Sequence, residues 1–329
     1  MKNSNLPLPF PCFIITGPTA VGKTAISIRL AKEINGEIIN ADSVQIYKGF
    51  DIGSAKPSRQ EMAETPHHLV DMLQPDEPFS VADFLRRATG IARNIRSRGK
   101  AVIVSGGTGL YINAFLNGLS PCPERNIPIR KGIEKYREKK GRTALFRLLE
   151  SIDPEAASRL HKNDTYRVTR ALEVYYATGE NISSWWKKKP VNIMGYSGPG
   201  HGAGAVRIVL MRPRGELCAR IDRRVDAMME QGFVMEVERL LESGCNPELK
   251  PLQSLGYRQI TAFLNGRISL DEAVMEIKRD TRRYAKRQMT WFRAMPGTRW
   301  YHPQQLEQEE SIFRFLMRYQ SMARKTISV

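Results

Sequence analysis

Residues 12–34 read CFIITGPTAVGKTAISIRLAKEI and contain the pattern G-x-x-x-x-G-K-[ST]. The run CFIIT is short, apolar and β-branched, which is typical of a buried parallel strand. The glycines that follow let backbone N–H groups converge on an anion without a Cβ in the way. Residues 25–34 then have helical spacing. A strand, a glycine-rich turn and a helix in this order predict a phosphate-binding loop.

The chemistry of this loop follows from its last residues. Lys23 supplies a positive charge to terminal phosphates, and the Thr24 hydroxyl can ligate Mg²⁺. The phosphate would lie at the positive end of the helix that begins there. The pattern indicates a phosphate site without saying whether the ligand is a nucleotide. The predicted phosphate-binding residues are Gly17, Pro18, Thr19, Ala20, Val21, Gly22, Lys23 and Thr24.

The charge of the chain is its most informative bulk property. Among 329 residues, 51 are basic and 34 acidic, which gives a formal net charge of +17. A small-molecule kinase does not need such an excess, whereas a partner with many phosphates would explain it. The alternative is a basic surface without a function.

The remaining composition is typical of a globular protein, with 41% hydrophobic and 26% charged residues. No apolar run approaches the roughly 18 residues of a membrane helix. The first 13 residues lack the pattern of a signal peptide. The four cysteines are far apart and form no C-x-x-C, which argues against zinc and a disulfide framework. We therefore expect a reduced, cytoplasmic protein.

The first 118 residues predict the first part of an α/β phosphate-loop core. Strands are expected within 12–16, 37–41, 67–73 and 101–118, with a helix capped by Ser80 and Asp83 between the last two. Strands that alternate with helices predict a mostly parallel sheet flanked by helices. Ligands bind at the carboxyl ends of such strands. The loops at 17–24, 42–47 and 106–111 should therefore share one crevice.

The rest of the chain predicts three further parts. Residues 119–205 lack strand signals and predict an all-helical insertion domain that ends in a glycine-rich linker, 192–205. Residues 206–302 predict the second part of the core, with a strand at 206–213, a helix pair broken near Gly232 and a basic helix at 277–295. Residues 303–329 predict a C-terminal tail helix.

The basic helix at 277–295 has two expected faces. At 100° per residue, Ile277, Tyr284, Gln288, Trp291 and Phe292 fall on one face, and Arg279, Arg282, Arg283, Lys286, Arg287 and Arg293 fall on the other. A solvated helix face is the simplest interpretation. We favour contact with a nucleic-acid backbone. A helix face with six basic residues and no interleaved acidic residues is costly by self-repulsion unless an anionic partner meets it.

Several segments together resemble one family, the tRNA dimethylallyltransferases. They are GPTAVGKT (17–24), NADSVQIYKGFDIGSAKP (40–57), PHHLVDML (66–73), FSVADF (79–84), GGTGLYI (106–112), RALEV (170–174), SLGYRQ (254–259) and RRYAKRQMTWFR (282–293). The resemblance covers nearly the whole chain, and its D-S-x-Q-x-Y and R-x-x-A-K-R-Q-x-x-W motifs are the specific ones. It implies transfer of a dimethylallyl group from dimethylallyl diphosphate to N6 of the adenosine on the 3′ side of the anticodon, adenosine-37, with release of diphosphate.

The resemblance also implies catalytic roles. Lys23, with Mg²⁺ on Thr24, would neutralise the leaving diphosphate. The family's diphosphate-binding arginine aligns with Arg224, although Arg223 is its neighbour. Asp42 matches the proposed base, and Thr108 the residue near the reacting adenine. Without the family, Asp42 could equally be an aspartate that holds a metal-bound water or caps a helix.

The implied partners are tRNA and the isoprenoid donor. We expect the chain to act as a monomer. The adenine must be flipped out to reach the crevice, and the insertion domain would clamp the anticodon stem. Val44 stands where many family members have arginine, so its side chain can form no hydrogen bond to the base and no contact with a phosphate. The residues that match tRNA-contacting segments, or that we assign to tRNA from their charge, are Asp42, Ser43, Val44, Gln45, Thr108, Arg130, Tyr166, Arg167, Val168, Thr169, Arg170, Leu252, Gln253, Ser254, Leu255, Gly256, Tyr257, Arg282, Arg283, Lys286 and Arg287.

Three other functions remain open from the residues. A nucleotide kinase would use the phosphate loop but leaves the basic helix unexplained. A prenyltransferase acting on free AMP or ADP leaves the long basic second half unexplained. An RNA-binding NTPase would form no covalent product.

Overall fold

A computed structural model describes residues 12–188 and 205–317 of the chain. The chain divides into two compact units, which we describe separately. Unit 1 contains residues 1–116 and 196–329, and unit 2 contains residues 117–195.

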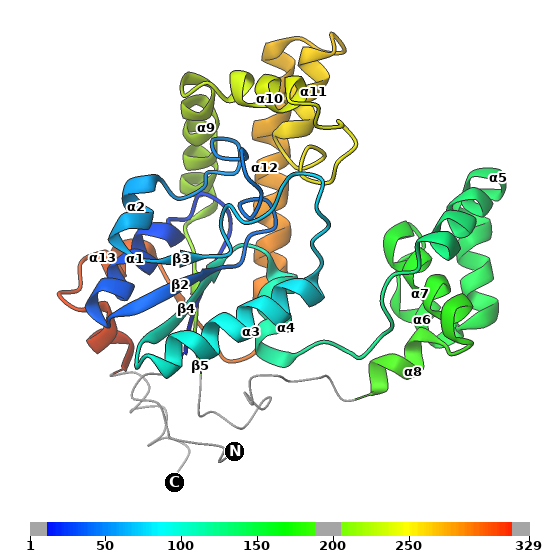
Figure 1. Cartoon of the computed structure of the whole chain (residues 1–329), viewed down its shortest axis with the longest axis horizontal. Helices are drawn as coiled ribbons and strands as arrows, with labels where there is room; N and C mark the ends of the chain where they lie inside the picture. The colour runs from blue at the N-terminus through cyan, green and yellow to red at the C-terminus, as the bar shows by residue number, and fades with distance from the viewer. Residues whose placement is uncertain (1–11, 189–204, 318–329) are drawn as a thin grey trace. The chain divides into compact units, whose positions relative to one another are not determined.

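Unit 1 is built on a sheet of six parallel strands in the order β3-β2-β4-β1-β5-β6 (Figure 1). The strands are β1 (Cys12–Thr16), β2 (Gly36–Asn40), β3 (His67–His68), β4 (Ala101–Gly106), β5 (Ala205–Leu210) and β6 (Thr298–Tyr301). The strand before the phosphate loop is thus central, with β4 and β5 as its neighbours. The fold class is α/β, as predicted.

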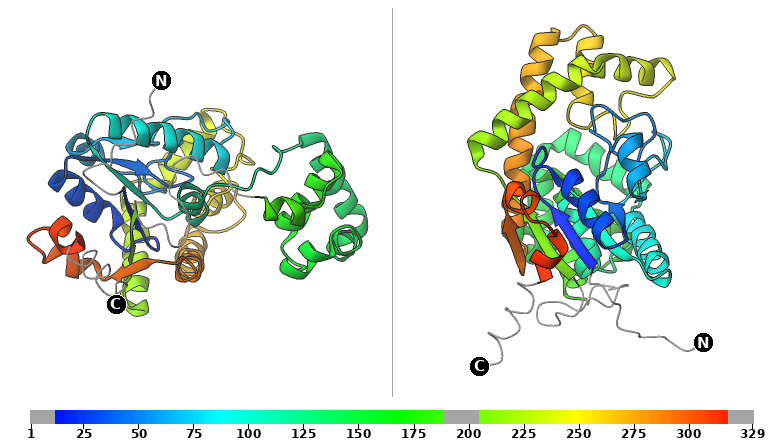
Figure 2. Two further views of the ribbon diagram at one scale, coloured as in Figure 1. Left: turned by 90° about the horizontal axis from the view of Figure 1, so that it is seen from below. Right: turned by 90° about the vertical axis from the view of Figure 1, so that its left-hand side faces the viewer.

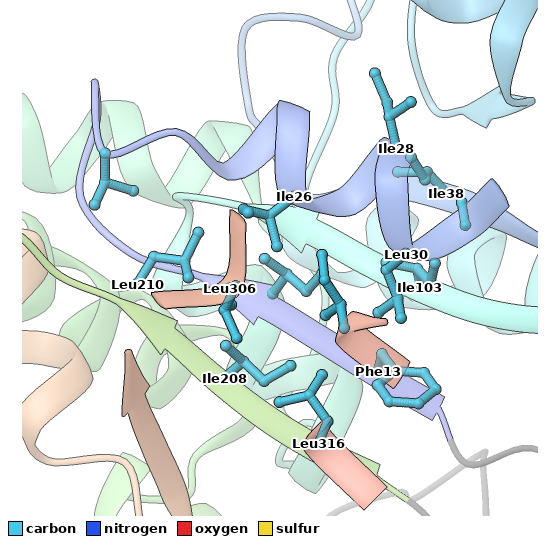
Figure 3. Close-up of a cluster of buried hydrophobic side chains, with 14 of the residues drawn as sticks. Phe13, Ile26, Ile28, Leu30, Ile38, Ile103, Ile208, Leu210, Leu306 and Leu316 are labelled. Atoms are coloured by element: carbon cyan, nitrogen blue, oxygen red, sulfur yellow. The ribbon is translucent and has the colours of Figure 1, made fainter. Parts of the chain in front are cut away.

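One hydrophobic core of unit 1 contains side chains of α1 (Lys23–Glu33), of the strands and of residues 306–316. Ile26 and Leu30 of α1 pack with Phe13 of β1, and Leu306 and Leu316 join the same cluster (Figure 3). Along each strand, the residues between those in this core point to the other face of the sheet. Because Ile26 and Leu30 share a core with Phe13, α1 is packed against β1 directly after the phosphate loop.

One helix follows each of the strands β2, β3 and β4 in the first part of unit 1. These helices are α2 (Arg59–Glu64), α3 (Val81–Ser97) and α4 (Gly109–Asn117). The predicted cap of α3 is confirmed, because Ser80 and Asp83 form a reciprocal capping box. In the views of Figure 2, α3 and α1 lie on opposite faces of the sheet.

A long helical connection joins β5 to β6. It contains α9 (Arg214–Glu230), α10 (Phe233–Glu242), α11 (Tyr257–Leu264) and α12 (Leu270–Arg293), and α13 (Pro303–Glu307) follows β6. The predicted break near Gly232 is confirmed: this residue has a φ of 92° and separates α9 from α10. The predicted inner face of α12 is also confirmed at Ile277, Gln288 and Phe292, which are buried.

Unit 2 is entirely helical in its described part. Its helices are α5 (Ile127–Ile152), α6 (Pro154–Arg159), α7 (Thr165–Thr178) and α8 (Ile182–Lys187). Gly141, with a φ of 83°, kinks α5. The unit has its own hydrophobic core, in which Leu145 and Leu149 of α5 pack with Leu172 of α7.

Three sequence predictions of secondary structure were wrong. The strand expected over 67–73 ends at His68, because Leu69 and Asp71 have positive φ values of 62° and 53° that turn the chain. The half-buried edge strand β6 was missed. The tail is not one continuous helix, because α13 ends at Glu307 and residues 312–317 form a separate helical segment.

Most of the glycine-rich segment 192–205 lies outside the described residues. All four cysteines are described and are free. Within residues 12–188 and 205–317, no helix combines the length and the apolar character needed to cross a bilayer.

Candidate active site

The three loops expected to share a crevice line one cavity of about 540 Å³ at the carboxyl ends of β1, β2 and β4. Lys23 and Thr24 come from the phosphate loop, Asp42 follows β2, and Gly107 follows β4. Arg220 and Arg224 of α9 and Tyr284 and Gln288 of α12 complete the lining. We call this space the phosphate cavity.

The phosphate loop has the backbone geometry that its glycines predict. Gly17 has a φ of 149°, and a Cβ at this position would lie 2.5 Å from the carbonyl oxygen of Leu210 in β5. Gly22 has a φ of 107° directly before α1. A side chain at either glycine would strain the loop, which explains the residue type at both positions.

Lys23 lies inside the phosphate loop. Its Nζ donates to the carbonyl oxygens of Gly17 at 3.1 Å and Pro18 at 2.9 Å. The pKa of Lys23 is lowered to about 8, mainly by burial and then by the charge of Arg224, against the opposing charge of Asp42. The ammonium is therefore poorly solvated, and an anionic ligand would stabilise it.

The structure distinguishes the two neighbouring arginines of α9. Arg223 is exposed, whereas Arg224 lines the phosphate cavity and a second cavity beside it. Burial lowers the pKa of Arg224, and the nearby Asp42 carboxylate opposes this shift. Of the two, Arg224 is the side chain that can meet a ligand held by the phosphate loop.

Asp42 shapes its own loop. Its Oδ1 accepts hydrogen bonds from the backbone N–H groups of Val44 at 2.9 Å and Gln45 at 3.4 Å. Only the main chain of Val44 takes part, so this turn does not depend on the side chain at position 44. The carboxylate lines both cavities and is therefore available to a ligand in either.

The second cavity is more apolar and measures about 350 Å³. It shares five lining residues with the phosphate cavity, namely Thr19, Asp42, Ser54, Arg224 and Tyr284. Its other walls include Ile221, Val225, Met228 and Phe233 from α9 and α10. Ser254, Leu255 and Gly256 before α11, and Tyr257 at the start of α11, also line it. We call it the apolar cavity. A ligand with an anionic end and an apolar end could occupy both spaces.

Thr108 follows the glycines that end β4. Its Oγ1 is buried and has no hydrogen-bond partner among the described residues. A buried hydroxyl without a partner is costly. Thr108 is not among the residues that line either the phosphate cavity or the apolar cavity beside it, whereas the preceding Gly107 lines the phosphate cavity. Gly106 is required here because a Cβ would lie 2.2 Å from the carbonyl oxygen of Ala41.

Sequence reasoning missed three side chains that hold the phosphate loop. Arg212 and Arg220 each donate from Nε, at 3.0 Å, to the carbonyl oxygens of Val21 and Ala20 respectively. Gln288 accepts from the N–H of Thr19 at 2.9 Å. The arginines have no motif that marks them. Gln288 had a signal, because it is a polar residue on the predicted buried face of its helix.

Two of the residues predicted to contact tRNA, Gln45 and Tyr257, use their side chains for hydrogen bonds within the protein. The Nε2 of Gln45 donates to the carbonyl oxygens of Ser54 and Ala55, both at 3.0 Å. Tyr257 is fully buried and donates its hydroxyl to Glu236 at 2.7 Å. Leu252 is also fully buried, whereas Gln253 is exposed.

Glu236 fixes the wall of the apolar cavity. It is a buried carboxylate in α10 that accepts from the backbone N–H groups of residues 51, 52 and 53 at 3.1, 2.6 and 3.2 Å. Gly53 packs so closely that a Cβ would lie 2.1 Å from the ring of Phe233. The segment that Gln45 contacts is thus tied to α10.

In unit 2, the structure separates the predicted tRNA contacts into exposed and buried side chains. Tyr166 is 54% exposed, and the guanidinium of Arg130 lies 5.2 Å from the centre of its ring. Arg130 and Arg170 form ion pairs with the buried Glu173, at 3.6 and 3.1 Å. Arg167 is exposed, and Val168 and Thr169 are buried.

The outer face of α12 is not uniformly basic, which corrects the sequence prediction. Asp280 lies on it and forms ion pairs with Arg258, Arg279 and Arg283. Arg282 pairs with Asp222 of α9. Asp280 stands between Arg279 and Arg282 in the sequence, and one carboxylate at this place neutralises part of the basic face. Lys286 and Arg287 are exposed and have no carboxylate partner in the described part of the chain.

The phosphate cavity offers few oxygen ligands of its own. This suits a Mg²⁺ ion whose other ligands would come from the phosphates of a substrate and from water. The Thr24 hydroxyl and the Asp42 carboxylate both line this cavity. Among the described residues, no cluster of three or more His, Cys, Asp or Glu side chains could hold a metal ion. Mg²⁺ commonly binds through one or two protein oxygens plus phosphates and water.

The fold and the site together define a phosphate-loop protein with an apolar cavity beside the loop. Comparison with known proteins is consistent with this geometry. The family model described as IPP transferase matches residues 45–295. The chain is 47% identical to the tRNA dimethylallyltransferase of Syntrophobacter fumaroxidans over 291 residues, which are 88% of this chain and 83% of the relative. It is 50% identical to tRNA dimethylallyltransferase 2 of Geotalea uraniireducens over 279 residues, or 85% and 88% of the two chains.

Solved structures agree with the sequence comparison. The full-length tRNA isopentenylpyrophosphate transferase of Bacillus halodurans has a TM-score of 0.62 and 40% identity, covering 88% of this chain and 89% of that one. A eukaryotic dimethylallyltransferase, solved acting on tRNA, has a TM-score of 0.75 and 27% identity, covering 96% and 79%. This chain therefore belongs to the IPP transferase family.

Proposed function

We propose that the chain transfers the dimethylallyl group of dimethylallyl diphosphate to N6 of adenosine-37 in tRNA and releases diphosphate. The observation that carries this proposal is the junction of the two cavities. The phosphate cavity and the apolar cavity meet at Asp42, Arg224 and Tyr284. The names of the relatives, and the eukaryotic relative solved acting on tRNA, support the same reaction.

The donor would lie with its diphosphate on the phosphate loop. Lys23, the loop amides and Arg224 would neutralise the charge that develops on the leaving oxygen. These groups are preorganised, because the loop carbonyls are held by Arg212 and Arg220. Mg²⁺ bound through Thr24 would supply additional charge neutralisation.

The acceptor amine would approach at the junction. Its nitrogen forms a bond to the first carbon of the allyl group, the bond from that carbon to the diphosphate oxygen breaks, and the N6 proton passes to Asp42. An exocyclic amine is a poor nucleophile because its lone pair is delocalised into the ring, so a carboxylate base contributes usefully. In this proposal the unpartnered hydroxyl of Thr108 would hydrogen-bond to the adenine.

Each unit, taken by itself, has exposed groups that could contact tRNA. Tyr166 and Arg167 of unit 2 and Lys286 and Arg287 of α12 are exposed. Aromatic and basic side chains suit the stacking and phosphate contacts of a single-stranded loop. We propose the same cytoplasmic location as the tRNA substrate.

The test is incubation of the purified chain with Mg²⁺, unmodified tRNA and labelled dimethylallyl diphosphate, followed by nucleoside digestion and mass analysis. Formation of N6-dimethylallyladenosine that depends on the donor supports the proposal. A parallel reaction contains labelled ATP. Hydrolysis of ATP without a prenylated nucleoside would contradict the proposal and favour a kinase or an RNA-binding NTPase.

A further inference from the structure

Gln288 of α12 connects two loops of the phosphate cavity that are far apart in the sequence. Its Oε1 accepts from the N–H of Thr19 in the phosphate loop at 2.9 Å. Its Nε2 donates to the carbonyl oxygen of Gly107 at 2.9 Å. One amide therefore bridges the loop after β1 and the loop after β4, and both bonds require the same orientation of the amide.

The surroundings of Gln288 leave this bridge little freedom. The residue is only 6% exposed. A Cβ on Gly107 would lie 2.5 Å from Nε2 of Gln288 and 3.7 Å from Nζ of Lys23. The ring of Trp291, one turn further along α12, lies against Gly109, where a Cβ would come within 2.6 Å. The face of α12 thus fits closely against both ends of the glycine-rich loop.

We propose that Gln288 is a positioning residue that fixes the distance between the phosphate loop and the loop that carries Thr108. This inference deepens the proposed function and rests on it. In that reaction the phosphate loop would hold the leaving group and the Thr108 loop would lie against the adenine. The allyl carbon and the amine must then be aligned within a fraction of an ångström, and Gln288 sets that alignment from outside the reacting atoms.

The physical reason is that the two loops hold different substrates. A shift of about 1 Å between reacting groups can lower a rate by roughly 10²-fold. Neither loop has to lose its own ligand for this to happen. Loss of the bridge should therefore lower the rate of the chemical step much more than it weakens binding of the donor.

The experiment uses two neutral variants of the full-length chain. Gln288→Met has nearly the same length but can form neither hydrogen bond. Gln288→Asn keeps the amide but is one methylene shorter, so it cannot reach both loops. The control is Ile95→Ala in α3, a fully buried residue that lines neither cavity. It measures how far a general loss of stability affects the rate.

Single-turnover prenyl transfer, the Kd of inorganic diphosphate and the thermal midpoint are measured for each protein. We expect Gln288→Met and Gln288→Asn to transfer about 10- to 100-fold more slowly, with the diphosphate Kd changed less than about threefold. Ile95→Ala should lose thermal stability and keep its single-turnover rate. A normal rate in both Gln288 variants would overturn the inference, and so would a loss that appears only as weaker diphosphate binding or that Ile95→Ala reproduces.

Hydrogen exchange separates this inference from the proposed function. If the unaltered protein transfers no dimethylallyl group, the proposed function fails. The bridge is still tested, because Gln288→Met should speed exchange of the Thr19 amide at least about fivefold in the absence of substrates. Unchanged exchange at Thr19 would show that Gln288 does not hold the loop.

Discussion

The carboxylate of Asp42 closes its own loop and faces both cavities, so its two tasks can be separated by substitution. Asn keeps an acceptor oxygen for the N–H of Val44 but cannot take a proton. We expect Asp42→Asn to lower turnover by roughly 10²- to 10⁴-fold while tRNA binding is kept. Near-normal turnover would remove Asp42 from the mechanism. Asp42→Ala, which also breaks the turn, should in addition weaken tRNA binding.

The lowered pKa of Lys23 predicts a pH dependence. Below about pH 8 the amine carries its charge, and above it the free protein increasingly holds a neutral amine. We therefore expect kcat/KM for dimethylallyl diphosphate to fall as the pH rises through about 8, because this parameter reports the free enzyme. Lys23→Arg should lose this limb, since a guanidinium stays charged. A profile that is flat from pH 7 to 10 in the unaltered protein would contradict the assignment.

For single residues, the sequence predicts the groups that would touch a ligand better than the side chains that hold those groups in place. The phosphate loop and Asp42 follow from local pattern, because glycines and strand ends constrain nearby atoms. Arg212, Arg220 and Gln288 act on loops some 190 to 270 residues away. No local pattern in one sequence specifies which carbonyl a distant arginine will reach.

Helix α12 carries some basic residues that pair with carboxylates and others that pair with none in the described part of the chain, which gives a matched comparison. Replacing both Lys286 and Arg287 by Gln should weaken tRNA binding and reduce its salt slope by about one to two units, one for each phosphate that is no longer neutralised. Arg279→Gln is the control, because Arg279 already pairs with Glu276 and Asp280. Filter binding at several salt concentrations measures both. If the salt slopes of tRNA binding are equal for all three proteins, Lys286 and Arg287 do not contact tRNA phosphates.

The segment held by Glu236 should be sensitive to a change that removes only charge. Gln at this position would direct an NH₂ group at N–H donors, leaving buried groups unpaired. We expect Glu236→Gln to lower the free energy of unfolding by about 1–3 kcal/mol. The matched control is Glu238→Gln on the exposed side of the same helix. Urea unfolding measures both, and equal stabilities would show that the carboxylate does not hold the segment.

Secondary structure was predictable where one element carries its own signal. The helix at 81–97 has a capping box and an apolar face, and both are observed. The prediction of a strand over 67–73 was wrong because the apolar residues there are buried in a turn. Leu73 pairs with Tyr47 through an isolated β-bridge and is not part of a strand. Strand β6 has only four half-buried residues and depends on pairing with β5. Tertiary context decided these cases.

The two units have separate cores, and their contributions to function should separate accordingly. Leu172 is fully buried in the core of unit 2, and truncation of such a leucine typically costs about 2–5 kcal/mol. We expect Leu172→Ala to weaken tRNA binding while inorganic diphosphate still binds normally. Calorimetric titration of both ligands measures this. Ile103→Ala in β4 is the counterpart in unit 1 and should impair diphosphate binding.

The place of β1 in the sheet has a consequence for synthesis on the ribosome. One neighbour of β1 is β5, which begins at residue 205, and the core beside α1 includes Leu306, Ile312 and Leu316. Unit 2 emerges before any of these residues, so it can complete its core first. The nascent chain must meanwhile carry β1 with one unpaired edge. A message truncated shortly before residue 298 supplies β5 but neither β6 nor Leu306, Ile312 and Leu316. Its product would expose one edge of β5 and part of the core beside α1, and is therefore expected to aggregate, even though it contains every residue of the phosphate cavity.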